Sequence, residues 1–219
     1  MATSIATQLS ALLGPESVLT DDTDRRVFSQ DIAGPREHVA TCVIRPRSVE
    51  QLCAAVAVST AAGIASVPRG GGASYTGGYV PDRDTCVLIH TRGLGRVVEV
   101  NTADMYVTVE AGCTWESLLA ALEPHGVRTP FWGPLSGATA TIGGSLSQNS
   151  ILWGSARYGV SAETVLALEV VLAEARCCAR APRRSARRDR SSVTTAPTSR
   201  ACSSAIPAPW ASRRGRRSS

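Results

Sequence analysis

Two glycine-rich stretches carry the most specific chemical signal in this 219-residue sequence. Residues 68–78 read PRGGGASYTGG and place five glycines in nine positions, and a second stretch ends in TIGG at residues 141–144. Because glycine lacks a Cβ atom, successive backbone N–H groups can turn toward one point and form an anion-binding nest. The two stretches therefore predict a site for the phosphate groups of a nucleotide.

Other phosphate-binding motifs do not match the sequence. A P-loop requires Gly-Lys-Ser/Thr after its first glycines, and neither stretch continues in that way. No G-x-G-x-x-G falls where a strand would meet a helix, as a Rossmann dinucleotide site requires. ATP binding through a P-loop and NAD binding through a Rossmann motif are therefore disfavoured.

The two stretches together, in this order and at this spacing, resemble the FAD-binding domain of PCMH-type flavoenzymes. These are the vanillyl-alcohol oxidase and p-cresol methylhydroxylase family, including FAD-linked oxidases similar to glycolate oxidase and D-lactate dehydrogenase. The resemblance extends from about residue 12 to residue 173. It implies an α+β fold in which two small α/β subdomains hold FAD between them. It also implies that the intact enzyme oxidises a 2-hydroxy acid or related alcohol by hydride transfer to FAD.

Carried over to this chain, the resemblance implies three groups of cofactor-binding residues. They are the first glycine-rich loop, the segment that ends shortly after TIGG, and a later part that would pass the isoalloxazine and adenine ends. The implied residues are Pro68, Arg69, Gly70, Gly71, Gly72, Ala73, Ser74, Gly77, Gly78, Pro134, Leu135, Ser136, Thr141, Ile142, Gly143, Gly144, Ser147, Gln148, Asn149, Tyr158, Gly159 and Val165. Some relatives attach FAD covalently through a His directly after the glycine-rich run. Ala73 and Ser74 stand there, so we expect FAD to be bound non-covalently.

Catalytic residues cannot be assigned from the sequence. His38, His90 and His125 are isolated from any carboxylate or Cys at ligand spacing, so each is more typical of a surface or core position. In the family that the chain resembles, the base and the anion clamp come mostly from a C-terminal substrate domain, which we do not find here. We therefore expect this chain to be inactive by itself, or to act as a catalytically silent nucleotide-binding module.

A few residues near the loops have two open interpretations. Arg69 could neutralise phosphate charge or form a structural salt bridge. Tyr75, Trp153 and Tyr158 could stack near the flavin, but aromatic residues beside glycine-rich loops are as often packing residues.

The cysteines and the apolar segments limit the remaining classes of protein. The seven cysteines are odd in number and form no C-x-x-C pair, which favours buried free thiols over disulfides or a zinc site. No apolar run reaches the ~18 residues of a membrane-spanning helix, and the N-terminus has no basic segment before an apolar one. We expect a cytoplasmic protein without a metal site or a membrane span.

Charge divides the chain into two compositions. Residues 174–219 contain 12 Arg and two acidic residues, a balance of +10, which leaves 11 basic and 16 acidic residues, or −5, for residues 1–173. The basic segment shows no apolar period and is expected to be disordered. Read one base out of frame, residues 194–213 allow YGPDLTGLFLGDTGALGVK, which resembles the family's last FAD-contacting segment. We therefore interpret residues 174–219 as a frameshift product; the alternative is an Arg-rich tail that binds nucleic acid or an acidic surface, and we expect no nucleic-acid partner.

Secondary-structure signals show which elements must position the two loops. Helices are expected at residues 8–13, 49–62 and 115–122, with local helix in 21–30. Strands are expected at residues 39–44, 64–67, 86–90, 96–100, 105–110 and 167–172. The first loop would leave the carboxyl end of strand 64–67 in a βαβ unit, which is where open α/β sheets bind ligands. The long stretch 130–159 is explained if it wraps a ligand.

These elements predict four parts of the chain. An N-terminal helical segment occupies residues 1–35 and the FAD-binding domain residues 36–173, with subdomains 36–92 and 93–173. Strand 167–172 is expected to close the second subdomain. Residues 174–219 form the out-of-frame tail.

Overall fold

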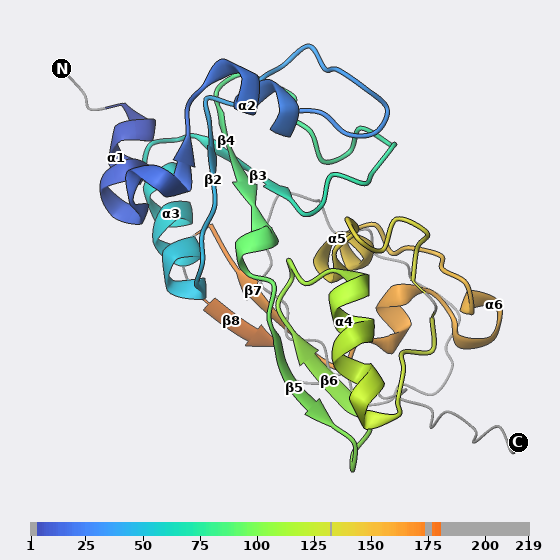
Figure 1. Cartoon of the computed structure of the whole chain (residues 1–219). Helices are drawn as coiled ribbons and strands as arrows, with labels where there is room; N and C mark the ends of the chain where they lie inside the picture. The colour runs from blue at the N-terminus through green and yellow to red at the C-terminus, as the bar shows by residue number, and fades with distance from the viewer. Residues whose placement is uncertain (1–3, 132, 174–176, 181–219) are drawn as a thin grey trace, which may run out of the picture.

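The structure, a computed structural model, describes residues 4–131, 133–173 and 177–180 (Figure 1). In the N-terminal half the elements are α1 (Ile5–Leu13), β1 (Val18–Leu19), α2 (Asp22–Phe28), β2 (Cys42–Ile44), α3 (Val49–Ala61), β3 (Ala65–Arg69) and β4 (Cys86–His90). In the C-terminal half they are β5 (Val97–Asn101), β6 (Tyr106–Val109), α4 (Trp115–Leu122), α5 (Ile142–Ser147), α6 (Ser155–Tyr158), β7 (Leu168–Val171) and β8 (Cys177–Arg180).

The two longest predicted helices form where local signals place them. The Ser48 hydroxyl accepts the Gln51 N–H (3.2 Å) at the start of α3, and the Thr114 hydroxyl accepts the Ser117 N–H (3.1 Å) at the start of α4. The buried residues of α3 follow helical spacing and face the sheet; they are Leu52, Ala55, Val56 and Ser59. Capping and apolar period therefore act together to fix both helices.

A four-stranded sheet positions the first glycine-rich loop. Its strand order is β1-β2-β4-β3, in which β2, β4 and β3 are parallel and β1 is an antiparallel edge. The central strand β4 lies between β2 and β3, so the expected βαβ unit has one strand inserted between its two strands. Arg69 is in register with His90 at the carboxyl end of the sheet, and the loop leaves from that end.

A second group of elements forms beside this sheet. The antiparallel hairpin β5–β6 and helix α4 pack around a separate apolar cluster that includes Val107, Trp115, Phe131 and Ile142. The stretch 130–159, expected as a long loop, contains α5 and α6. Thr141 caps α5 by accepting the Gly144 N–H (3.2 Å), which explains why a glycine-rich segment forms a short helix here.

Strands β7 and β8 differ from the sequence-based expectation. Strand β7 forms within residues 167–172, but its buried Val171 packs in the first apolar cluster, with α1 and α3, so it does not close the second subdomain as predicted. Residues Cys177–Arg180, expected to be disordered, form β8 antiparallel to β7; that part of the prediction is wrong. Pairing of backbone groups along an open strand edge does not depend on an apolar side-chain pattern. The remainder of the predicted tail lies outside the described residues.

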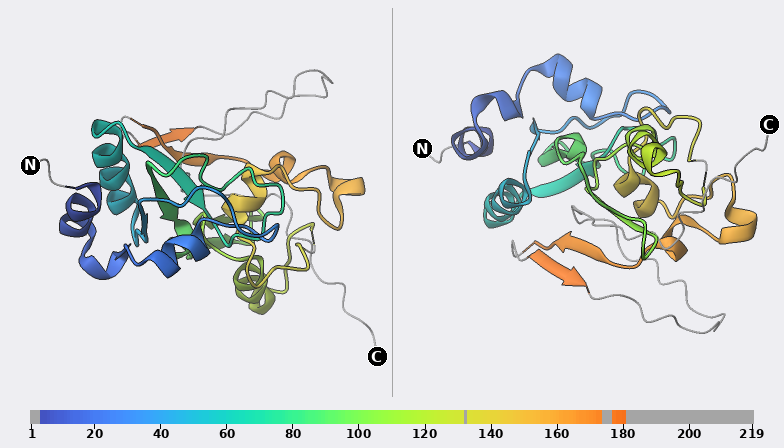
Figure 2. Two further views of the ribbon diagram at one scale, coloured as in Figure 1. Left: turned by 90° about the horizontal axis from the view of Figure 1, so that it is seen from above. Right: turned by 60° about the horizontal axis from the view of Figure 1, so that its bottom comes forward.

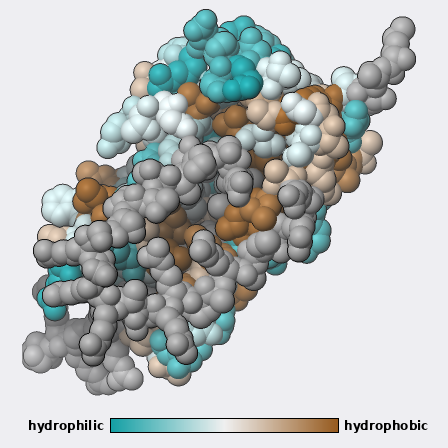
Figure 3. Space-filling model, turned by 180° about the vertical axis from the view of Figure 1, so that it is seen from behind, coloured by the Kyte–Doolittle hydropathy of each residue, from teal (hydrophilic) through white to brown (hydrophobic). Residues whose placement is uncertain are grey.

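Figures 1 and 2 show how these elements are arranged. Helices α1 and α3 lie at one end and α4, α5 and α6 at the other, and both views of Figure 2 place β7–β8 on the side away from α2. Seen from behind, hydrophilic side chains cover the end where α2 lies (Figure 3). None of the helices in the described part of the chain is both long and apolar enough to cross a membrane.

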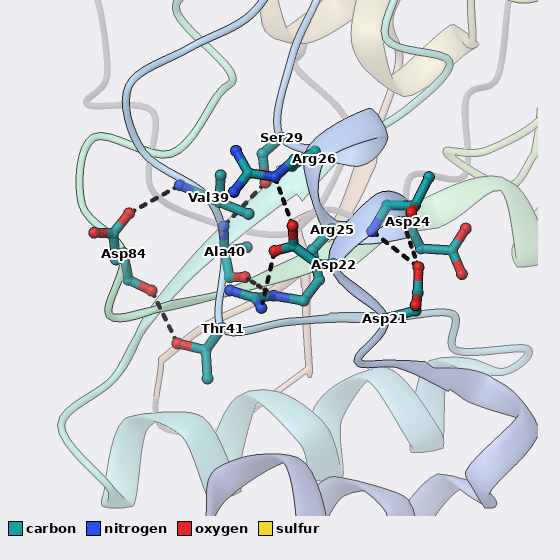
Figure 4. Close-up of polar contacts among 11 residues, drawn as sticks. Asp21, Asp22, Asp24, Arg25, Arg26, Ser29, Val39, Ala40, Thr41 and Asp84 are labelled. Atoms are coloured by element: carbon teal, nitrogen blue, oxygen red, sulfur yellow. Dashed lines mark hydrogen bonds and ion pairs between the residues drawn. The ribbon is translucent and has the colours of Figure 1, made fainter.

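Helix α2 is fastened to the chain that enters β2 (Figure 4). The Arg25 Nε donates to the Ala40 carbonyl (2.7 Å), and the Ala40 N–H donates to the buried Ser29 hydroxyl (3.0 Å). These bonds hold both ends of the connecting segment 30–39, which runs past the first glycine-rich loop.

Candidate cofactor site

A cavity of about 460 Å³ lies between the first glycine-rich loop and the segment around α5. Such a volume is within the range of small-molecule and cofactor sites, about 300–1,000 Å³. Tyr79 spans the two sides of the site, because its hydroxyl donates to the Ser147 carbonyl (2.8 Å). The exposed side chains of Tyr75 and Ile151 add apolar surface to the lining.

The structure brings most of the predicted cofactor residues together at this cavity. Those that line it are Pro68, Arg69, Gly70, Gly71, Gly72, Ala73, Ser74, Pro134, Ser136, Thr141, Gly143, Gly144, Ser147, Gln148 and Asn149. Outside the lining are Gly77, Gly78, Leu135, Ile142, Tyr158, Gly159 and Val165. Leu135 is 98 % exposed, whereas Ile142 is buried in the second apolar cluster and donates its N–H to the Cys113 carbonyl (2.8 Å).

Several lining residues are not among the predicted site residues, although those between residues 140 and 152 belong to the stretch 130–159 that is expected to wrap a ligand. They are Asp31, Tyr79, Thr91, Ala111, Ala140, Ser145, Ser150, Ile151 and Leu152, and Tyr75, whose role the sequence leaves open, joins them. The Thr91 hydroxyl donates to the Arg69 carbonyl (3.2 Å), so the end of β4 holds the start of the loop. A search for polar residues directly after predicted strands would have found Thr91, but Asp31 has no comparable local signal.

The two glycine-rich segments touch, and their contact requires glycine. A Cβ atom on Gly71 would overlap the carbonyl oxygen of Thr139, and one on Gly70 would overlap the Thr141 hydroxyl. Backbone atoms cannot move aside as the end of a flexible side chain can. The contact therefore explains why consecutive glycines stand at the point where the two segments meet.

Backbone N–H donors without an acceptor lie in the first loop, beside this contact. Among the described residues, the N–H groups of Gly71, Gly72, Ala73 and Ser74 have no hydrogen-bond acceptor. By contrast, the Gly143 N–H donates to the Ala111 carbonyl (2.8 Å) and the Gly144 N–H to Thr141. The first loop thus offers free amide donors that suit a phosphate, and the second segment forms the opposing wall.

The Arg69 side chain connects the start of the loop to the end of α2 and the residues after it. Its guanidinium donates to the Gln30 carbonyl and lies 5.6 Å from the centre of the Phe28 ring. Burial lowers the pKa of Arg69, and the nearby Asp31 carboxylate partly opposes that shift. Gly72, with φ +69°, lies so close to this guanidinium that a Cβ atom on residue 72 would overlap it. Arg69 is therefore held by a carbonyl and an aromatic ring while it lines the cavity, and its role beside a phosphate stays a prediction.

No lining group in the described part of the chain is suited to remove a proton at neutral pH. His and Cys are absent from the lining, and its ionisable residues are Asp31, Arg69, Tyr75 and Tyr79. Burial acts to raise the pKa of Asp31, but hydrogen bonds from Arg36, Gly77 and Ala33 outweigh it and lower that pKa. Burial raises the pKa of Tyr79.

The histidines, and the cysteines whose side chains the structure describes, lie outside the cavity lining. His90 packs edge-on against Phe28, and burial together with Arg45, Arg69 and Arg92 lowers its pKa to about 4. Cys42, Cys86 and Cys113 are buried free thiols, and burial raises the pKa of each to about 11. Within the described ranges, no three His, Cys, Asp or Glu side chains gather as a metal site would require.

A buried tryptophan lies next to the cavity wall. The Trp115 Nε1 donates to the hydroxyl of Ser145 (2.8 Å), and Ser145 lines the cavity. Trp115 is the first residue of α4 and belongs to the second apolar cluster, so this bond ties the cavity wall to that cluster.

Comparison with known proteins places this geometry in a family. Glycolate oxidase subunit GlcD of Bacillus subtilis (strain 168) is 30 % identical over 166 residues, which are 76 % of this chain and 35 % of that protein. The protein named Probable D-lactate dehydrogenase, mitochondrial, of Danio rerio is 30 % identical over 171 residues, 78 % of this chain and 33 % of its own length. This chain therefore spans about a third of these curated relatives.

A solved structure and a family model agree with these relatives. The crystal structure of p-cresol methylhydroxylase with substrate bound superposes with a TM-score of 0.77 and 16 % identity, over 96 % of this chain and 43 % of that one. It confirms the expected α+β fold of the PCMH type. The model of the family described as FAD binding domain matches residues 40–178, which include both sides of the cavity. The chain belongs to this family of FAD-binding domains.

Proposed function

We propose that the cavity between residues 68–78 and 134–152 is the FAD site of this chain and that it holds FAD non-covalently. The observation that carries the proposal is the contact of Gly70 and Gly71 with Thr139 and Thr141, which leaves free amides beside the cavity. In this proposal the first loop binds the pyrophosphate, and the predicted residues in the lining hold the rest of the cofactor. No His or Cys lines the described cavity, which supports non-covalent binding.

We further propose that the intact enzyme oxidises a 2-hydroxy acid. Two relatives are named for glycolate and D-lactate, and both compounds carry a hydroxyl group on the carbon next to a carboxylate. Bound FAD supplies the hydride acceptor for oxidation at such a carbon. The residues that line the cavity in this chain would bind and orient the cofactor.

The chain as it stands is proposed to be a cofactor-binding unit without turnover. The only lining carboxylate in the described residues, Asp31, already accepts hydrogen bonds from three donors, and Tyr79 donates to Ser147. Neither group is free to take the hydroxyl proton of a substrate. The alternative of nucleic-acid binding through an Arg-rich tail concerns residues outside the described part of the chain.

An absorption spectrum after incubation with FAD and desalting tests the cofactor assignment. We expect the flavin band at roughly 450 nm to stay with the protein. Denaturation in guanidinium should then release all of the flavin, and flavin that stays attached to the chain would contradict non-covalent binding. A colourless folded protein would contradict the site itself.

Anaerobic addition of glycolate or D-lactate to the FAD complex tests the lack of turnover. The flavin band should persist with this chain, and bleaching would show that the proposed unit is catalytically complete. Resequencing the gene tests the frameshift proposal independently, because some single-base change must restore the long reading frame. With that frame restored, the same acids should bleach the flavin.

A further inference from the structure

Three consecutive residues before the FAD-binding match hold the first glycine-rich loop at three points. The Gln30 carbonyl accepts from Arg69 at the start of the loop, and the Ile32 N–H donates to the Ser74 carbonyl (2.9 Å) in its middle. Between them, the Asp31 carboxylate accepts the Gly77 N–H (2.8 Å) at its end. The free amides of residues 71–74 lie between the first two of these points, and Asp31 holds the loop just beyond them.

Asp31 is itself fixed in place. Its carboxylate also accepts from the Arg36 guanidinium (2.8 Å) and the Ala33 N–H (3.1 Å), and only 3 % of its side chain is exposed. Gly77, at φ +71°, lies against the same guanidinium, so that a Cβ there would come within 3.0 Å of it. The buried carboxylate therefore joins the Arg36 guanidinium to the loop backbone.

The segment that carries Asp31 is anchored at both ends. Ser29, directly before the segment, accepts the N–H of Ala40, directly after it. Arg25 in α2 donates to the carbonyl of the same Ala40 (Figure 4). A short segment closed in this way has few conformations left, so the Asp31 side chain can fix the end of a loop whose glycines leave it many conformations.

We infer that Asp31 is a positioning residue for FAD: by holding the end of the loop at Gly77, it keeps residues 71–74 in the shape that presents their free amides to the cofactor. The inference rests on the proposed function. It makes part of the connecting segment, residues 30–36, belong to the cofactor site, although the family match begins only at residue 40.

Titration of FAD into matched variants tests the inference. Asp31→Asn removes the charge that holds Arg36 and Gly77, and we expect a rise of about tenfold in the Kd for FAD. Asp21→Asn is the control: its carboxylate also accepts a backbone N–H, from Thr23 (2.8 Å), but it lies at the start of α2, outside both the cavity lining and the segment 30–39 (Figure 4). The Kd of the control should stay at the wild-type value, and Asp31→Glu, which keeps the carboxylate, should recover part of the lost affinity.

Three outcomes would overturn the inference. Asp31→Asn could bind FAD as the wild type does, Asp31→Glu could bind FAD as weakly as Asp31→Asn, or Asp21→Asn could lose as much affinity as Asp31→Asn. Wild-type chain that binds no FAD would overturn both this inference and the proposed function, whereas wild-type binding with unchanged Asp31→Asn affinity removes the inference alone.

Amide hydrogen exchange in the wild-type chain provides a measurement that does not depend on how a variant folds. Without FAD, the Gly77 amide should exchange slowly because it is bonded to Asp31, and the Gly72 amide should exchange fast. FAD should slow Gly72 strongly and Gly77 little. Equal exchange rates of the Gly72 and Gly77 amides without FAD would contradict the hydrogen bond from Gly77 to Asp31 and with it the inference.

Discussion

At the scale of single residues, Gly71 tests whether the contact between the two segments makes the site. We expect Gly71→Ala to lose FAD binding, because the added methyl group overlaps the Thr139 carbonyl and must push the segments apart. Gly78→Ala is the matched control, since its methyl group would meet only the Thr76 hydroxyl at 3.4 Å. Desalting after FAD incubation compares the two. Equal flavin retention in both variants would show that the loop contact is not needed.

His90 makes stability depend on pH. Its folded pKa of about 4 lies below the ordinary value of 6.5, so between these values the unfolded chain takes up a proton that the folded chain does not. The free energy of unfolding should therefore fall as pH drops from 6.5 toward 4, by about 1–2 kcal/mol after allowance for solvent screening at this half-buried site.

Urea unfolding at pH 7 and pH 4.5 measures this effect. His90→Gln should show a smaller loss of stability between the two pH values than the wild type, whereas the exposed His125→Gln should behave as the wild type does. The same pH dependence in all three proteins would assign the loss to other groups.

At the scale of elements, the Tyr79 hydroxyl joins the segment after the glycine-rich loop to helix α5. Tyr79→Phe deletes the bond to the Ser147 carbonyl, and we expect the Kd for FAD to rise about 2- to 10-fold. Tyr106→Phe loses a similar bond, from its hydroxyl to Glu99 (2.8 Å), on the distant β5–β6 hairpin and serves as the control. Flavin fluorescence titration gives both Kd values. A larger rise of the Kd in Tyr106→Phe than in Tyr79→Phe would contradict a role of the Tyr79 bond in FAD binding.

Elements with local causes could be predicted from the sequence, and elements with distant partners could not. Ser48 and Thr114 cap helices whose apolar spacing follows at once, so α3 and α4 form as expected. The predicted place of β7 was wrong, because nothing in residues 167–172 indicates which apolar cluster receives Val171. Asp31 was missed since its acceptor role depends on Gly77, 46 positions away. Local signals alone put its segment in a separate N-terminal part.

At the scale of the whole molecule, the cofactor site lies between two apolar clusters. One cluster contains α1, α3 and the sheet, and the other contains α4 and the β5–β6 hairpin. A ligand that binds only the folded chain at 100 times its Kd should raise the free energy of unfolding by about 2.7 kcal/mol. Urea unfolding with and without FAD measures this rise, and Gly71→Ala should show none. An equal rise in that variant would mean that FAD binds away from the loop contact.

The hydrogen bond between Trp115 and Ser145 gives the chain an optical reporter of its own. The indole is one side chain away from the cavity wall and shielded from solvent, so a bound isoalloxazine ring would accept its excitation energy. Occupancy of the site is therefore expected to dim the emission of Trp115, and the emission of the exposed Trp153, which follows the lining residue Leu152, should fall with it. Cofactor loading could then be followed in real time, without a label, and at protein concentrations too low for absorbance.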